Sequence, residues 1–254
     1  MHALHLLTST IPLAAIILWT LLIRRERMSR DGYFSLPPSA TAWAATDLEA
    51  LARAVARLEE LGWPPSFLLM YDEAWALVHH LKEVIFLTSG NTLLHDFSVF
   101  HVSGKGGSGG GGGGGNARES VSGATTTAGG GAAAGWPPHR DRGADAAANR
   151  FRSDGSPEYC TAWVALTAAS PTNSCLYVVP KAHDAGYHGG DGSRNPLSSI
   201  FNTAGAFQHI RALPCGAGEV VVFSHRLLHW GSAADELARE DKGKTKVRHD
   251  PRVQ

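Results

Sequence analysis

The chain has 254 residues, of which 43% are hydrophobic, and this suits one domain with a sizeable core plus additional segments. Lys and Arg together number 23, as do Asp and Glu, so the formal net charge at pH 7 is zero. That balance argues against a nucleic-acid-binding protein, which usually needs a basic surface. The three cysteines are an odd and sparse set, which argues against a disulfide framework. They include no Cys-x-x-Cys pair, which argues against a structural zinc site.

The N-terminal segment is apolar. It reads "ALHLLTSTIPLAAIILWTLLI" (Ala3–Ile23) and is followed by "RRER" (Arg24–Arg27). Because about 20 apolar residues can span a bilayer, residues 1–27 predict a hydrophobic anchor in the form of a transmembrane helix. The basic cluster predicts that the rest of the chain faces the cytosol, and without an anchor the protein would be cytoplasmic. A cleaved signal peptide fits less well, and a true start at Met28 is the alternative.

Two amphipathic helices are predicted next. In Thr46–Trp63 the apolar residues recur at helical spacing, with Thr46 as the candidate cap and Pro64 beyond the end. The second predicted helix is Tyr71–Gly90. The aromatic and β-branched residues of Leu93–Ser103 then favour a strand.

A low-complexity segment interrupts the chain at residues 104–135, which are mostly glycine, serine, alanine and threonine. It predicts a flexible insertion between two strands. Short β-rich runs separated by turn signals follow, at Glu158–Thr167, Ser174–Pro180 and Gly218–Ser232. Helices followed by many strands indicate an α+β fold with an antiparallel sandwich or jelly roll.

The stretch "AGWPPHRDRGAD" (Ala134–Asp145) follows the glycines directly and contains a His-Arg-Asp triplet. A protein-kinase catalytic loop has the same triplet but requires Asn seven residues after the His. That position is Ala146, and no Asp-Phe-Gly motif occurs in the chain. The kinase interpretation is therefore rejected.

A metal site is the second interpretation of this stretch. His139 and Asp141 are two residues apart, so on a strand both would point to one face and Arg140 to the other. A non-haem Fe(II) site needs two His and one carboxylate. The distant stretch "FSHRLLHWGS" offers His225 and His229 as the third ligand. From the residues alone, histidines without any metal role remain the alternative.

Three blocks follow one another in the chain: "GWPPHRDR", "CTAWVALTAASPTNSCLYVVPKAHD" (Cys160–Asp184) and "GAGEVVVFSHRLLHWGS" (Gly216–Ser232). In this order they resemble the phytanoyl-CoA dioxygenase (PhyH) family of Fe(II)/2-oxoglutarate-dependent oxygenases. In the middle block Ser174 stands where the family usually has Gly. The resemblance implies a double-stranded β-helix (jelly roll, cupin-like) in residues 28–254, with the N-terminal helices packed on the sheet.

The resemblance also implies the iron ligands. They would be His139, Asp141 and His229, with Fe(II) as the metal and 2-oxoglutarate and O₂ as co-substrates. His229 is preferred because its Leu-Leu-His-Trp-Gly-Ser context is similar to the family's. His225 would then be a core histidine, and His183 is expected to shape the mouth of the barrel.

The far carboxylate of 2-oxoglutarate needs a fixed cation, for which the fork of Arg is suited. The family places this Arg in a Pro-Arg-hydrophobic stretch, which implies Arg252, with Arg239 as the alternative. Trp163 and Ser232 are expected to line the co-substrate, although Trp163 also suits an ordinary core. The family continues its strand beyond this Arg, so we expect the chain to be truncated at its C-terminus.

The expected function is that of an Fe(II)/2-oxoglutarate-dependent dioxygenase hydroxylating a small organic or lipid-derived substrate. Asp141 favours hydroxylation, because related halogenases have a small residue in place of the carboxylate. One alternative is a catalytically impaired, membrane-tethered jelly-roll binding module, and another is a cupin-type metal enzyme that does not use 2-oxoglutarate. The expected partners are a small-molecule or lipid-like substrate and a membrane, with no nucleic acid.

Overall fold

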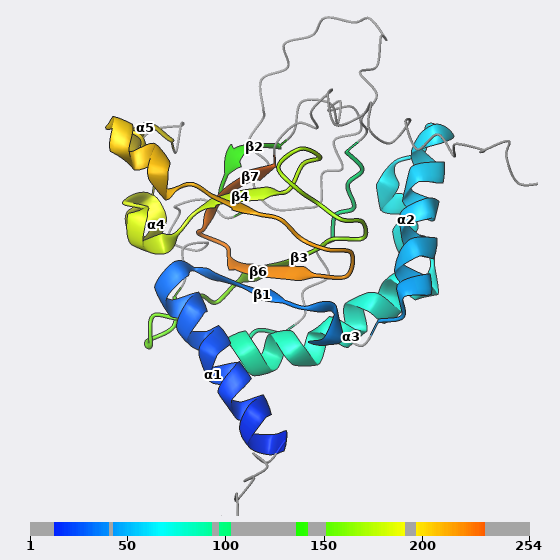
Figure 1. Ribbon diagram of the computed structural model, residues 1–254, viewed down its shortest axis with the longest axis horizontal. Coiled ribbons are helices and arrows are strands. Elements are labelled where there is room, and N and C mark those ends of the chain that lie inside the picture. Colours follow the sequence, from blue (N-terminus) through cyan, green and yellow to red (C-terminus); the bar gives the residue numbers. More distant parts are fainter. Residues whose placement is uncertain are drawn as a thin grey trace, which may run out of the picture.

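The computed structural model describes residues 13–40, 43–92, 97–102, 136–141, 151–190 and 197–231. Within these ranges the strands form two antiparallel sheets (Figure 1). One sheet has the order β1-β6-β3 and the other the order β2-β7-β4-β5. The strands are β1 (Tyr33–Leu36), β2 (Trp136–His139), β3 (Cys160–Val164), β4 (Leu176–Val179), β5 (Arg211–Leu213), β6 (Val220–Ser224) and β7 (Leu228–Gly231).

The main core lies between the two sheets. Val221 and Phe223 of β6 pack there against Leu176 and Val178 of β4, and all four are buried. Since successive side chains of a strand point to opposite faces, Val220 and Val222 point out of the other face of the first sheet. The two sheets with their shared core bear out the expected antiparallel architecture.

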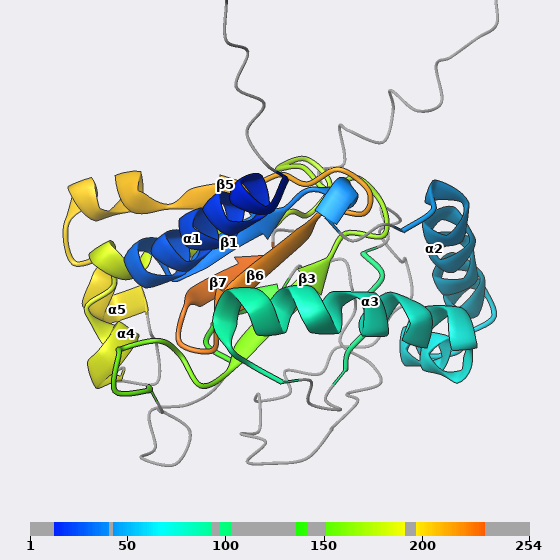
Figure 2. The same ribbon diagram turned by 90° about the horizontal axis from the view of Figure 1, so that it is seen from below.

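Helices cover the outer face of the first sheet. α1 (Leu13–Asp31) and α3 (Asp72–Ser89) both run across it (Figures 1 and 2). Met28 of α1 and Leu81 of α3 are buried there in one cluster with Phe34 and Val222. The N-terminal helices therefore pack on the sheet as expected.

The N-terminal helix differs from the expected anchor. α1 continues through the basic cluster to Asp31, and Arg25 Nη2 donates a hydrogen bond to Leu87 O of α3 at 3.1 Å. In the part of the chain that the structure describes, no helix is long and apolar enough to cross a membrane. The expected transmembrane helix thus has no support here. The division into residues 1–27 and 28–254, which α1 crosses, and the cytosol-facing location both stay predictions.

The start of the predicted helix Thr46–Trp63 also needs correction. α2 (Ala45–Glu60) begins after Ala44, whose side chain makes no capping hydrogen bond, so Thr46 lies inside the first turn and is not the cap.

Residues 97–102 are irregular, so the strand expected over Leu93–Ser103 is wrong where the structure describes it. The predicted insertion at residues 104–135 lies outside the described ranges.

Short elements complete the described chain. They are η1 (Pro38–Ala40), η2 (Pro65–Met70), η4 (Lys181–His183), α4 (Gly186–Gly189), α5 (Leu197–Ile200) and η5 (Ala204–His209). α2 packs on η2 and α3 through a small cluster of its own, to which Leu51, Val55 and Leu68 belong. α5 instead covers the outer face of the second sheet, where Ile200 packs on Leu228.

The β-rich run Gly218–Ser232 forms two strands that lie in different sheets. β6 ends at Ser224, residues 225–227 turn, and β7 then pairs with β2 and β4 in the second sheet. This crossing brings His229 beside the strand that carries His139.

The backbone at Ser174 shows why glycine suits this position in the family pattern. Its φ is +75°, in the left-handed region that costs about 1–2 kcal/mol for a residue with a Cβ. Because glycine adopts this region freely, Ser174→Gly should raise the free energy of unfolding by about 0.5–1 kcal/mol. Urea denaturation measures the change. Ser35→Gly within β1 is the control and should lower the same quantity, so a loss of stability in both variants would contradict the prediction.

Candidate metal centre

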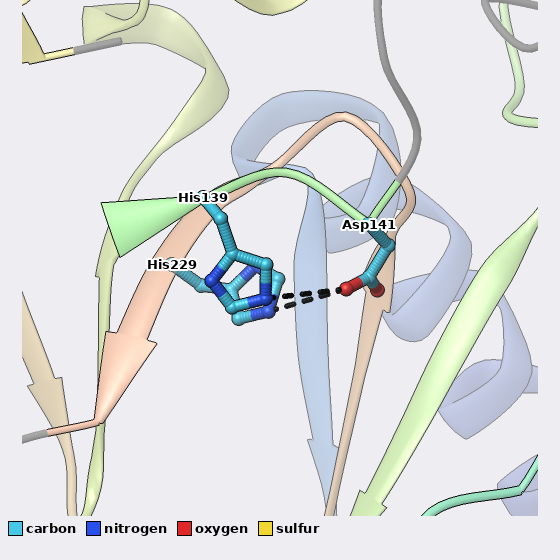
Figure 3. Close-up of side chains that lie close together, drawn as sticks. All are labelled: His139, Asp141 and His229. Atoms are coloured by element: carbon cyan, nitrogen blue, oxygen red, sulfur yellow. Dashed lines mark ion pairs between the residues drawn. The ribbon is translucent and has the colours of Figure 1, made fainter. Parts of the chain in front are cut away.

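Two histidines face each other across neighbouring strands. β2 and β7 are antiparallel, and their register places His139 directly opposite His229. Residues directly opposite in an antiparallel pair carry their side chains on the same face. The two rings accordingly lie with their centroids 4.3 Å apart, and both point toward Asp141 (Figure 3).

Asp141 completes the cluster from just beyond β2. The strand expected to carry both His139 and Asp141 already ends at His139, yet the two side chains still meet. Asp141 Oδ1 lies 3.7 Å from His139 Nε2 and 3.4 Å from His229 Nε2. One ligand atom from each residue fits within 4.8 Å of the others, so the three side chains could hold a single metal ion.

The backbone orients both imidazole rings in the same way. His139 Nδ1 lies 2.8 Å from Pro137 O, and His229 Nδ1 lies 3.0 Å from Leu227 O. Since a carbonyl only accepts, each Nδ1–H donates, and in a neutral ring Nε2 is then the nitrogen that can bind a metal. Two neutral imidazoles and a carboxylate are a donor set that suits Fe(II), so the residues present fit the expected ion.

Burial favours the neutral form of the His139 imidazole. Desolvation lowers the pKa of His139, and the neighbouring His229 lowers it further, whereas the carbonyl of Pro137 opposes the shift. A low pKa leaves the imidazole unprotonated near neutral pH, as a metal ligand must be.

The cluster is buried on one side and open on the other. The His229 side chain is 7% exposed and its ring lies 4.5 Å from that of Phe223, centroid to centroid. The side chains of His139 and Asp141 are instead 32% and 27% exposed. Any co-substrate must therefore approach from the side of His139 and Asp141.

Sequence reasoning missed one residue of the site. Thr161 of β3 donates its hydroxyl to Asp141 Oδ2, which leaves Oδ1 facing the two imidazoles. A signal for this was present, because Thr161 stands two residues before Trp163 and so shares its strand face.

The other histidines are not part of the cluster. His225 is 1% exposed, and its Nδ1 lies 3.0 Å from Tyr159 O, as suits a histidine of the core. His183 is exposed on η4, where it stacks on His209 with the ring centroids 3.6 Å apart.

The residues expected to bind the co-substrate are only partly described. Trp163 is half-buried against the core between the sheets, a place that fits both a core role and a co-substrate role. Ser232, Arg239 and Arg252 lie outside the described residues, so their roles stay predictions.

Comparison with the first of the following solved structures, SnoN, shows a shared fold. The epimerase SnoN in complex with Fe3+, alpha ketoglutarate and nogalamycin RO superposes with a TM-score of 0.50 at 17% identity, covering 85% of this chain and 78% of SnoN. AviO1 from Streptomyces viridochromogenes Tue57 gives 0.44 at 19% identity, with 85% and 88% covered. EctD from S. alaskensis with 2-oxoglutarate and 5-hydroxyectoine gives 0.45 at 16% identity, with 84% and 70% covered. No curated protein matches the chain.

Sequence comparison identifies the domain that carries the cluster. Residues 123–235 match the family model for Phytanoyl-CoA dioxygenase (PhyH), and this range contains His139, Asp141 and His229. The match confirms the family resemblance seen in the sequence. The cluster of two histidines and an aspartate fits the expected Fe(II)- and 2-oxoglutarate-dependent enzyme class. Residues 123–235, a little under half of the chain, are therefore the part that is similar to the phytanoyl-CoA dioxygenase family.

Proposed function

We propose that the protein hydroxylates a small organic or lipid-derived substrate, with Fe(II) held by His139, Asp141 and His229. The observation that carries the proposal is the cluster itself, in which both Nε2 atoms and Asp141 Oδ1 converge. When bound, iron would supply the oxidation chemistry that couples 2-oxoglutarate decarboxylation to substrate oxidation. The carboxylate of Asp141 supports hydroxylation over halogenation, because it occupies the position that a halide would need.

The protein's own residues orient and shield this chemistry. Thr161 holds the Asp141 carboxylate, and Phe223 covers the buried side of His229. The exposed side next to His139 leaves room for ligands that the protein does not supply. A protein usually contributes to a cofactor's chemistry by fixing the side chains that bind it and by excluding water from one side of the site.

The co-substrate is proposed to lie along the face of β3. Trp163 follows Thr161 on this face and would flank 2-oxoglutarate. The guanidinium of Arg140 is bound to Asp184, so its charge is already used. The far carboxylate therefore needs another cation, and we propose Arg252, with Arg239 as the alternative and Ser232 as a further hydrogen-bond donor.

Succinate formation tests this proposal. The purified full chain, supplied with Fe(II), 2-oxoglutarate and O₂, should release succinate even without the substrate, through uncoupled turnover. His139→Ala should abolish this release because it removes one nitrogen from the cluster. His79→Ala on the exposed face of α3 is the matched control and should leave the rate unchanged.

The alternatives give different results in this assay. A protein that binds Fe(II) but forms no succinate would favour a cupin-type enzyme that does not use 2-oxoglutarate. A protein that binds neither would contradict the proposal and favour a binding module without catalysis.

A further inference from the structure

A buried ion pair lies directly beside the metal cluster. Arg140 stands between the ligands His139 and Asp141, and its side chain points away from them, as the strand geometry predicts. Its Nη1 and Nη2 donate to the two carboxylate oxygens of Asp184 at 2.5 and 2.8 Å. The side chains of Arg140 and Asp184 are 3% and 0% exposed. The pair is therefore bidentate and almost completely removed from water.

A second buried arginine closes a ring of hydrogen bonds around this pair. Arg140 Nη1 also donates to Arg226 O at 2.5 Å. The guanidinium of Arg226, which is fully buried, donates to Tyr187 O at 3.1 Å and to Gly186 O at 2.8 Å. The backbone N–H of Gly186 donates in turn to Asp184 Oδ1 at 2.9 Å. These hydrogen bonds join three segments of the chain, at Arg140, at Asp184–Tyr187 and at Arg226.

The ring connects both segments that carry metal ligands. Arg140 lies within the segment of His139 and Asp141, whereas Arg226 stands in the turn that leads from β6 to His229. Asp184 follows β4, the strand that pairs with β7 on the side opposite β2. If the segment of His139 or the segment of His229 shifted, a hydrogen bond of a charged side chain that is buried from solvent would break.

Stability alone does not account for such a pair. The desolvation of two buried charges consumes much of their attraction, so apolar replacements of similar size are often as stable. Bidentate pairing of Arg with a carboxylate does, however, define distance and direction together. Because the Arg140–Asp184 pair lies beside the metal cluster, its fixed geometry would fix the distances between the metal ligands.

We propose that Arg140, Asp184 and Arg226 are positioning residues, which hold His139 and Asp141 at the correct distance from His229. The inference rests on the proposed function, because it concerns the same metal cluster. It adds residues that neither bind the metal nor touch the co-substrate. The expected consequence is that metal affinity and metal geometry depend on the bidentate pair.

Co(II) binding to the full chain tests the inference. Arg140→Lys keeps the charge but cannot form both hydrogen bonds, so we expect Co(II) to bind about 10–100-fold more weakly, as for other groups that orient metal ligands. We also expect the visible d–d absorption of the Co(II) protein to shift, which a merely structural role would not produce. Asp184→Asn should have the same two effects.

A double variant separates positioning from folding. Arg140→Met with Asp184→Leu removes both charges together, so the protein should still fold. We expect it to bind Co(II) as weakly as Arg140→Lys does, while its urea midpoint stays close to that of the wild type.

Arg152 supplies the matched control. Its side chain packs against the C-terminal end of α3, where Nη2 donates to Asn91 Oδ1 at 2.6 Å, and its Nη1 donates to Pro157 O at 2.7 Å. Arg152→Lys should lower stability without changing Co(II) affinity or absorption.

The outcomes distinguish this inference from the proposed function. Wild-type Co(II) affinity and absorption in both the Arg140→Lys and the double variant would overturn the inference and leave the metal cluster intact. An equal loss of affinity in Arg152→Lys would also overturn it, because the effect would then come from stability. A wild-type protein that binds no Co(II) would overturn the proposed function together with the inference.

Discussion

Replacing His229 by alanine is expected to weaken Co(II) or Fe(II) binding more than the about 10–100-fold that follows the loss of an outer partner of a metal site. His229 has the most buried of the three ligand side chains, at 7% exposed. A water molecule that replaced the His229 imidazole as a ligand would have to occupy a buried position next to the ring of Phe223. Competition with a metal-binding dye measures the change in affinity, and succinate release should disappear with it.

His225 provides the control for this variant, because it lies four residues earlier and is equally buried. Its ring contacts Phe151 and Tyr159. His225→Ala should therefore lower the free energy of unfolding by about 2 kcal/mol through the cavity and the lost hydrogen bond. Its metal affinity should stay at the wild-type value. The reverse result, with metal lost in His225→Ala and kept in His229→Ala, would contradict the assignment.

The choice between these two histidines shows what the sequence can and cannot predict. The context of His229 favours it, but the β-rich run Gly218–Ser232 contains no Gly or Pro at its centre and does not reveal that it forms two strands in two sheets. Arg226 in the middle of this run looks like a solvent-facing residue, since arginine is rarely fully buried. In the structure it is 0% exposed and turns the chain from one sheet to the other.

The spacing of two residues between His139 and Asp141 predicted that their side chains would lie together, and this has a physical reason. Residues two apart share a face in extended backbone, and this direction persists although the strand stops at His139. The partners of the ligand segment are not local. Thr161 is 20 residues from Asp141, and Asp184 is 44 residues from Arg140. Their contacts depend on how the two sheets pack, which no spacing within one strand encodes.

The N-terminal helix shows a second limit. The apolar composition of Ala3–Ile23 favours a bilayer span, but composition does not say where a helix ends or what its last turns contact. α1 continues to Asp31, and buried Met28 joins it to the sheet. The basic residues that suggest a membrane boundary are thus part of a helix packed on the domain.

Thr161→Val is expected to weaken metal binding by about 10–100-fold, because it removes the donor that orients a metal-binding carboxylate. Valine keeps the shape of threonine, so β3 should pack as before while Asp141 Oδ2 loses its hydrogen bond. Without that bond either oxygen of Asp141 can turn toward the histidines. Thr161→Ser restores the hydroxyl and should return the affinity to within a few-fold of the wild-type value.

Thr88→Val makes the same chemical change away from the cluster. Thr88 is buried in α3, where its hydroxyl donates to Val84 O at 2.6 Å. Its removal should change the free energy of unfolding by no more than about 1 kcal/mol and leave the metal affinity unchanged. Equal metal affinities in Thr161→Val and the wild type would mean that the backbone beyond β2 is sufficient to orient Asp141. A loss confined to Thr161→Val, and reversed by serine, would assign that orientation to a single hydroxyl supplied by the opposite sheet.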